Sequence, residues 1–347
     1  MNPITIALDG MGGDHAPDMV VRGADLARQR FPHVRFVLFG IEGRLKPLLD
    51  RYSRLAKLTE ICHTDDVVRG EDKPSVALRA GRASSMRMAI DAVRAGAAAA
   101  VVSAGNTGAL MAMAKFVLKT MPGIDRPAIA SYFPTSRGES VMLDLGANVS
   151  CDANNLFQFA VMGNVFARTV LGVLEPSIGL LNVGSEEQKG SDVLREANAL
   201  IREAKLPGSY CGFVEGNDIV SGTVDVIVTD GFTGNVALKA IEGTAKLYSD
   251  FLKRAFRSSW TAGLGYMLAR PALNKLRARS DPRRYNGAIL LGLNGIAVKS
   301  HGGTDAFGFS NAIGVAVDML QHGLLEKIRQ DLERVSVTAA PPAAAAL

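Results

Sequence analysis

The stretch AAAAVVSAGNTG, residues 97–108, places a short apolar run directly before a loop of small and polar residues. The same order of apolar run, loop rich in Gly, Asn, Asp or Ser, and helix-compatible segment recurs along the chain. This alternation predicts parallel strands joined by crossover helices, which is a doubly wound α/β sheet. The other instances are ITIAL with DGMGGDHAPD (4–18), SVMLDL with GANVS (140–150), SIGLL with NVGSEEQKG (177–190) and VDVIVT with DGFTGN (224–235).

Loops that follow parallel strands gather at one edge of a sheet, where α/β proteins bind their ligands. Glycine supplies 36 of the 347 residues, a share above the usual roughly 7%, which favours tight turns and loops that approach a ligand closely. We therefore expect the glycine-rich loops to converge on one site. We expect residues 1–337 to form a single α/β domain of two lobes, and the Ala- and Pro-rich residues 338–347 to be a disordered tail.

The bulk composition excludes several classes of protein. No run approaches the ~18 apolar residues of a membrane span, and the N-terminus lacks the basic and apolar regions of a signal peptide, so a cytoplasmic location is expected. The cysteines Cys62, Cys151 and Cys211 are odd in number and lack a CxxC pattern. Neither a disulfide framework nor a zinc site is therefore predicted.

Two of the loops suit a phosphate group. AGNTGA (104–109) and DGFTGN (230–235) each precede a helix, whose N-terminus offers unpaired N–H groups that glycine leaves accessible to an anion. Neither contains GxxxxGK[ST], so an ATP-binding P-loop is not supported. DGMGGD (9–14) has the wrong spacing for a dinucleotide fingerprint, and we interpret it as a turn that shapes the cleft. The candidate binding residues in the loops are Gly105, Asn106, Thr107, Gly108, Asn148, Asp230, Gly231, Thr233 and Gly234.

Two further segments place cations beside predicted strand ends. A surface lysine is normally only solvated, but Lys189 and Lys299 adjoin glycine-rich strand ends and not a helix face. His301 fits a general base or a phosphate donor, and it fits a hydrogen-bonded structural role equally well. The candidates here are Gly184 and Lys189 in NVGSEEQKG, and Asn294, Lys299 and His301 in LNGIAVKSHGG.

The positive charge of the chain is concentrated in one segment. Between Lys246 and Arg284, ten Lys or Arg stand against Asp250 and Asp281, a local balance of +8, so the remainder of this +5 chain sums to −3. Such a concentration points to a local partner.

Apolar residues are interleaved with these cations at helical spacing, for example Phe251, Ala255 and Phe256. They predict a helical pair, broken near Gly263 and Pro271, with an apolar stripe beside a basic one. It is either a surface helix packed on its own core or an interfacial helix that contacts anionic lipid, a second subunit or an acidic protein. The candidate docking residues are Arg254, Phe256, Arg257 and Trp260.

Taken together, DGMGGDHAP, SAGNTGA, LDLGAN, NVGSEEQKG, EGNDI, TDGFTGNVALK and GLNGIAVKSHG resemble the signature segments of the PlsX family, the acyl-ACP:phosphate acyltransferases. The resemblance extends from about Ile4 to Leu320. It implies a three-layer α/β/α sandwich similar to isocitrate and isopropylmalate dehydrogenases and to phosphotransacetylases, from which the basic helical segment at about 246–284 protrudes. It also implies that Lys189 and Asn235 match positions suspected of activity in relatives.

The implied reaction moves a fatty acyl group from acyl carrier protein to inorganic phosphate, giving an acyl phosphate for glycerol-3-phosphate acylation in phospholipid synthesis. Such an attack needs no protein nucleophile, because phosphate is already anionic and a thiol departs readily. Lys189 fits the holding of phosphate, and the Asn235 amide fits stabilisation of the oxyanion. The resemblance implies no metal, cofactor or nucleic acid, a homodimer, and peripheral contact with a membrane or its glycerol-3-phosphate acyltransferase.

Three alternatives remain open at this level. A phosphate acetyl- or butyryltransferase would share the fold but has no reason to carry the basic apolar segment. A decarboxylating dehydrogenase needs a cluster of metal-binding aspartates and a nicotinamide loop, and the sequence offers neither. A non-catalytic membrane adaptor would have little use for five glycine-rich loops.

Overall fold

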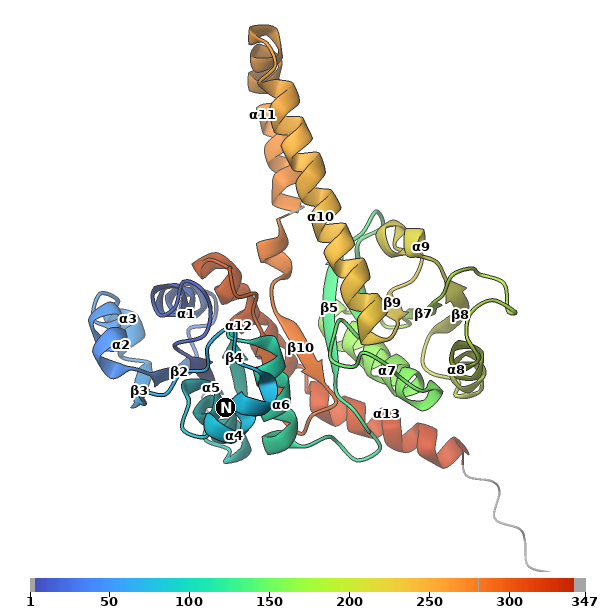
Figure 1. The fold of residues 1–347 in the computed structure, drawn as a ribbon, viewed down its shortest axis with the longest axis horizontal. Coiled ribbons are helices and arrows are strands. Elements are labelled where there is room, and N and C mark those ends of the chain that lie inside the picture. The colour runs from blue at the N-terminus through green and yellow to red at the C-terminus, as the bar shows by residue number, and fades with distance from the viewer. Residues whose placement is uncertain (1–3, 280, 340–347) are drawn as a thin grey trace, which may run out of the picture.

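The computed structural model describes residues 4–279 and 281–339. Its strands form one 11-stranded sheet in the order β3-β2-β1-β4-β11-β10-β5-β6-β9-β7-β8 (Figure 1). The strands are β1 Ile4–Asp9, β2 Val34–Gly40, β3 Thr59–His63, β4 Ala100–Ser103, β5 Ala128–Pro134, β6 Glu139–Leu143, β7 Ser177–Leu181, β8 Ser209–Val214, β9 Val226–Val228, β10 Ala288–Leu291 and β11 Ile296–Lys299.

Helices occupy the connections between the strands. The last of them reaches Ala339, so it includes the first two residues of the predicted tail, and residues 340–347 lie outside the described chain. The helices are α1 Asp18–Arg30, α2 Glu42–Leu49, α3 Ser53–Ala56, α4 Pro74–Ala80, α5 Ser85–Arg94, α6 Thr107–Leu118, α7 Ala153–Phe166, the π-helix η1 Ala167–Leu171, α8 Asp192–Glu203, α9 Gly216–Ser221, α10 Gly231–Phe256, α11 Trp260–Arg279, the 3₁₀ helix η2 Pro282–Tyr285, α12 Ala306–Gln321 and α13 Leu324–Ala339.

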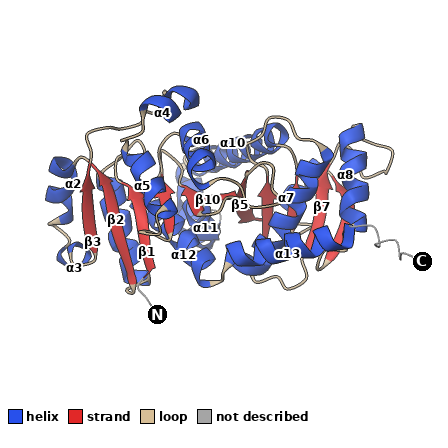
Figure 2. Cartoon of the chain, turned by 90° about the horizontal axis from the view of Figure 1, so that it is seen from below, coloured by secondary structure: helices blue, strands red, loops and turns tan. Residues whose placement is uncertain are grey.

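Two hydrophobic cores lie on opposite faces of the sheet, because successive strand residues point to opposite sides. Leu8 and Val102 belong to the core that α1, α7, α12 and α13 cover. Ala7 and Val101 belong to the core that α5, α6 and the first turns of α10 cover. Figure 2 shows α6 and α10 on one side of the sheet and α12 and α13 on the other. The predicted three-layer α/β/α sandwich is confirmed.

The direction of the strands differs from the prediction. β1 to β4 and β11 are parallel to one another, and so are β6 to β9, but β11–β10, β10–β5 and β5–β6 pair antiparallel. Three successive reversals make the two parallel sets run in opposite directions. The expectation that all glycine-rich loops follow one edge of the sheet is therefore wrong, and the loops form two groups.

The basic segment forms a helical hairpin of α10 and α11 that projects from the body of the protein (Figure 1). The chain turns at residues 257–259, and not near Gly263 or Pro271, because Ser259 caps α11 by accepting the amide of Ala262 at 3.1 Å. Gly263 and Pro271 lie inside α11, where the exposed surface lets water reach the carbonyl that proline leaves unpaired. No helix among the described residues has the length and apolar character to cross a membrane.

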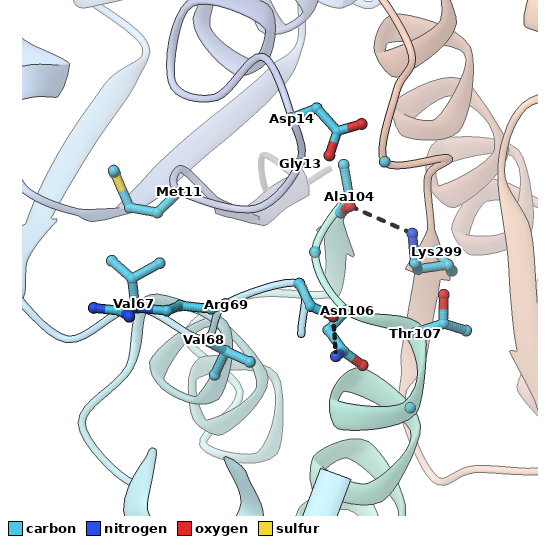
Figure 3. A pocket seen from close by; sticks show the side chains of 14 residues that line it. Met11, Gly13, Asp14, Val67, Val68, Arg69, Ala104, Asn106, Thr107 and Lys299 are labelled. Carbon is cyan, nitrogen blue, oxygen red and sulfur yellow. Dashed lines mark hydrogen bonds between the residues drawn. The ribbon is translucent and has the colours of Figure 1, made fainter. Parts of the chain in front are cut away.

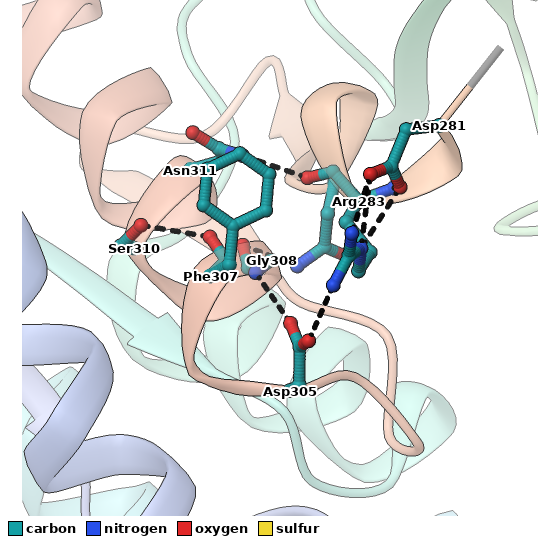
Figure 4. Close-up of polar contacts among 8 residues, drawn as sticks. Asp281, Arg283, Asp305, Phe307, Gly308, Ser310 and Asn311 are labelled. Carbon is teal, nitrogen blue, oxygen red and sulfur yellow. Dashed lines mark hydrogen bonds and ion pairs between the residues drawn. The ribbon is translucent and has the colours of Figure 1, made fainter. Parts of the chain in front are cut away.

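The 3₁₀ helix η2, which follows the hairpin, is attached to α12 through Arg283. Its guanidinium contacts Asp281 at 2.6 Å and Asp305 at 2.7 Å, and it lies over the ring of Phe307 (Figure 4). Asp305 also caps α12 by accepting the amide of Gly308 at 3.0 Å. The base of the hairpin is thus tied to a helix of the opposite layer.

Candidate active site

A cavity of about 530 Å³ lies where β1, β4 and β11 end (Figure 3). Four segments form its walls: the loop after β1, the turn between β4 and α6, the connection between β3 and α4, and the end of β11 with the loop that follows it. Its lining residues are Met11, Gly13, Asp14, Val67, Val68, Arg69, Gly70, Ala104, Gly105, Asn106, Thr107, Gly108, Lys299 and Gly302. Five of the predicted binding residues therefore meet here, namely Gly105, Asn106, Thr107, Gly108 and Lys299.

The N-terminus of α6 presents unused main-chain donors to this cavity. Asn106 caps the helix by accepting the amide of Ala109 at 3.0 Å, and its own amide donates to the carbonyls of Gly70 and Asp72. The amides of Thr107 and Gly108 have no acceptor among the described residues. Two open N–H groups at the start of a 12-residue helix favour an anion.

Lys299 ends β11 and is 8% exposed. Its ammonium donates to the carbonyl of Ala104 at 3.4 Å and to that of Ser300. Burial lowers the pKa of Lys299 to about 8, although Asp9 and Asp14 act to raise it. Because an ammonium has three N–H donors and two are used here, one remains for a ligand in the cavity.

The second group of predicted residues surrounds the ends of β6 and β9. Asp230 caps α10 by accepting both the amide and the hydroxyl of Thr233 at 2.8 Å. The amide of Gly231 donates to the carbonyl of Asn148 at 2.8 Å, and the Asn148 side chain donates to Asp144 at 2.9 Å. These groups therefore satisfy one another, unlike the amides of α6.

Glycine at the start of α10 is needed for packing. A Cβ on Gly231 would lie 2.6 Å from the carbonyl oxygen of Asn148, and one on Gly234 would lie 1.9 Å from that of Asp144. Asn235 is exposed beside Gly146. The loop after β6 thus packs on the helix where an anion was predicted to bind.

Lys189 lies in the loop between β7 and α8, on the same edge of the sheet as Asn235 but outside the cavity. Its side chain is 55% exposed and its ammonium is 4.0 Å from Glu186. Gly184 packs against that pair, since a Cβ there would meet Glu186 at 2.7 Å. No contact among the described residues joins Lys189 to Asn235.

The remaining two predicted residues lie apart from the cavity lining. The exposed ring of His301 accepts the amide of Gly303 at 3.2 Å, and its main chain donates to Asn286. Asn294 lies at the opposite end of β11 from Lys299, where its amide donates to the carbonyl of Thr120 at 2.8 Å. It closes the C-terminus of α6 and does not join the site.

Sequence reasoning missed the β3–α4 connection and gave Asp9 only a turn-forming role. Arg69 and the two valines before it line the cavity, but they belong to none of the strand, loop and helix units in the sequence. Asp9 is 1% exposed and lies at the end of β1. Asp9 could have been recognised from the sequence as an acidic residue at the end of an apolar strand. The described residues contain no group of three or more His, Cys, Asp or Glu side chains that could hold a metal ion.

Known proteins place the chain in a family. The model of the family described as "Fatty acid synthesis protein" matches residues 4–327. The "Phosphate acyltransferase" of Rhodospirillum centenum is 69% identical, over 95% of this chain and 93% of its own length. The chain belongs to the PlsX family of phosphate acyltransferases. The "Phosphate acyltransferase" of Paramagnetospirillum magneticum, 60% identical over 98% and 97% of the two chains, agrees.

The solved structures that resemble this phosphate acyltransferase share its fold. A phosphotransacetylase from Streptococcus pyogenes has a TM-score of 0.62 at 17% identity, with 93% of this chain and 94% of that one covered. A branched-chain phosphotransacylase from Enterococcus faecalis has a TM-score of 0.57 at 14% identity, with 92% and 99% covered. The predicted similarity of fold to phosphotransacetylases is confirmed. The chain is an acyltransferase of fatty acid and phospholipid synthesis, which argues against the dehydrogenase and adaptor alternatives.

Proposed function

We propose that this phosphate acyltransferase moves a fatty acyl group from acyl carrier protein to inorganic phosphate, and that the product serves a membrane-bound glycerol-3-phosphate acyltransferase. The observation that supports it best is the meeting of two open amides, of Thr107 and Gly108, with the Lys299 ammonium in one cavity. Main-chain donors together with a cation suit a multiply charged tetrahedral anion. The cavity also has room beside the anion for a thioester.

The chemistry follows from the charge of phosphate. An oxygen of HPO₄²⁻ attacks the thioester carbonyl carbon, the new C–O bond forms, the C–S bond breaks, and the proton of phosphate passes to the leaving thiolate. The protein has to position the reactants and stabilise the oxyanion. In this proposal Lys299 and the α6 amides hold phosphate. Lys189 and Asn235 belong to the other loop group, and in this proposal they contact the acyl donor away from the reacting carbon.

Trapping of the product tests this function. The protein is mixed with long-chain acyl carrier protein and phosphate, and the product is captured with hydroxylamine. We expect phosphate to raise the rate of hydroxamate formation above the background that hydroxylamine gives with the thioester alone. Equal hydroxamate without phosphate contradicts the proposal, and a preference for short acyl-CoA would favour the acetyl- or butyryltransferase alternative.

Lys189→Ala and Asn235→Ala are each expected to raise the KM for the acyl donor by ~10-fold, because each removes a hydrogen bond to it. The KM for phosphate should change little, because neither side chain lines the cavity. Steady-state kinetics measure both constants. Lys327→Ala and Asn217→Ala, exposed residues of α13 and α9, serve as controls that should keep full activity. A normal KM for the acyl donor in either test variant removes that residue from the acyl-donor site.

Phosphate affinity should depend on pH through Lys299. Its pKa of about 8 means that the side chain is charged below pH 8 and neutral above it. The KM, expressed as the concentration of the HPO₄²⁻ ion, is therefore expected to be flat below this value and to rise up to ~10-fold per pH unit above it. Lys299→Arg should abolish the rise, since a guanidinium stays charged. A KM that is constant from pH 7 to 9.5 in the natural protein contradicts the assignment.

We propose that the α10–α11 hairpin is a docking surface for anionic lipid. Trp260 at its turn is 82% exposed, and no ion pair of Arg254 or Arg257 is found among the described residues. Phe256 instead packs on Tyr266 within the hairpin, with ring centroids 5.4 Å apart. The other exposed apolar residues of the hairpin are Leu247, Tyr248, Phe251, Leu252, Leu264, Met267, Leu268 and Leu276.

Vesicle flotation separates the partners proposed for the hairpin. We expect salt-sensitive binding to anionic phosphatidylglycerol vesicles and none to phosphatidylcholine vesicles. Trp260→Ser should weaken the affinity for anionic vesicles by ~10-fold, because the ring that would be buried in the lipid is removed. Leu174→Ser changes an equally exposed residue outside the hairpin and should bind normally. If Trp260→Ser instead changes the molecular mass in solution, the surface joins two subunits of a homodimer.

A further inference from the structure

Asp9 is a buried carboxylate that lies beneath the cavity and that the proposed reaction does not use. Its side chain accepts the hydroxyls of Ser85 and Ser103, each at 2.7 Å, and the amide of Met11 at 3.3 Å. The hydroxyl of Ser103 itself accepts the amide of Gly105 at 3.0 Å, so its proton must point to Asp9. Burial raises the pKa of Asp9, and the bonds from Ser103, Ser85 and Met11 oppose that effect because each favours the ionised carboxylate.

These bonds connect Asp9 to two walls of the cavity. Through Ser103 it is linked to the turn that leads into α6, which carries the open amides. Through Ser85, whose amide donates to the main-chain carbonyl of Asp66 at 3.0 Å, it is linked to the β3–α4 connection. The loop after β1 packs tightly on this carboxylate, because a Cβ on Gly12 would lie 2.5 Å from an Asp9 carboxylate oxygen.

The carboxylate is also the foremost negative charge acting on Lys299. The charged side chains around this lysine are Asp9 at the end of β1, Asp14 in the next loop and Arg69 across the cavity. Burial lowers the pKa of Lys299, and Asp9 opposes that effect more than Asp14 does. Asp14 is exposed, so solvent weakens its influence.

We infer that Asp9 is the positioning residue of the phosphate cavity: its carboxylate fixes the turn that carries the open amides and keeps Lys299 charged. The inference rests on the proposed function of the cavity. A carboxylate placed directly under an anion site would repel the anion, but the charge of Asp9 is stabilised by hydrogen bonds from two serine hydroxyls and opposed by the ammonium of Lys299. Asp9 therefore acts on phosphate only through Lys299 and Ser103.

Kinetics of three variants over pH 6.5 to 9.5 test the inference, with phosphate as the varied substrate. Asp9→Asn should raise the KM for phosphate by ~10-fold and move the pH at which KM begins to rise down by about one unit. Asp9→Glu keeps the charge but adds a methylene to this tightly packed site, so it should return that pH to the natural value without returning the KM itself. Asp50→Asn, an exposed aspartate of the first lobe, is the control and should behave as the natural protein.

Ser103→Ala keeps the carboxylate and releases the turn, so it covers the case in which Asp9→Asn fails to fold. It should raise the KM for phosphate ~10-fold at every pH without moving the pH at which this KM begins to rise. The inference is overturned if the KM for phosphate begins to rise at the natural pH in folded Asp9→Asn, or if this KM is unchanged in Ser103→Ala. If phosphate does not raise hydroxamate formation by the natural protein itself, the proposed function fails instead, and the two failures are distinct.

Discussion

Lys299→Met is expected to lose roughly 10²–10³-fold in kcat/KM for phosphate, because the cavity then has no buried cation to pair with the anion. Methionine fills nearly the same volume as the lysine stem, so the walls keep their packing. The protein should unfold at the same temperature or higher. Since burial lowers the pKa of Lys299, the folded state bears a penalty for the charge that methionine removes.

Steady-state kinetics and a thermal melt of the same preparation measure this prediction. The matched control is Lys115→Met, which changes an exposed lysine of α6, the helix whose N-terminus lines the cavity. It should retain full activity. A loss of activity in Lys299→Met that accompanies a lower melting temperature would mean that the lysine supports the fold and not the anion.

Gly234→Ala is expected to cost at least ~3 kcal/mol of unfolding free energy. The added Cβ would stand 1.9 Å from the carbonyl oxygen of Asp144, a main-chain atom that cannot move without shifting the whole loop after β6. The melting temperature should fall by at least ~5 °C. Activity should also fall, because the first turn of α10 carries Asn235.

Gly243→Ala is the control in the same helix. No atom lies within 4 Å of a Cβ at Gly243, and alanine is the better helix former, so this variant should gain ~0.5–1 kcal/mol. The two substitutions are chemically identical and have opposite expected signs. If both stabilise the protein, α10 does not pack on the loop after β6 as described.

The layered fold was predictable because each strand, loop and helix unit is local in sequence. The reversal at the centre of the sheet was not predicted, because β5 and β10 belong to none of those units. β5 and β6 form a hairpin across residues 135–138, closed by the amide of Thr135 donating to Gly138 at 2.7 Å. A glycine in a four-residue link was the local signal for that hairpin. Because this hairpin was not predicted, both groups of glycine-rich loops were expected at the same edge of the sheet.

The site was predictable in part for a related reason. AGNTG and DGFTGN show the same pattern, but the first keeps two neighbouring open amides, whereas in the second Gly231 donates to Asn148 and only the amide of Phe232 lacks an acceptor among the described residues. That difference is a tertiary contact that local sequence does not carry. Asn294 and Lys299 are close in sequence, yet the strand between them spans ~15 Å and separates their environments.

The most direct test of the account is a crystal structure grown with phosphate at a concentration well above its KM. We predict a tetrahedral anion within ~3 Å of the amides of Thr107 and Gly108 and of the Lys299 ammonium. The anion should be absent from Lys299→Met crystals grown in the same solution. An empty cavity in the natural protein, with phosphate bound beside Lys189 and Asn235, would contradict the central claim.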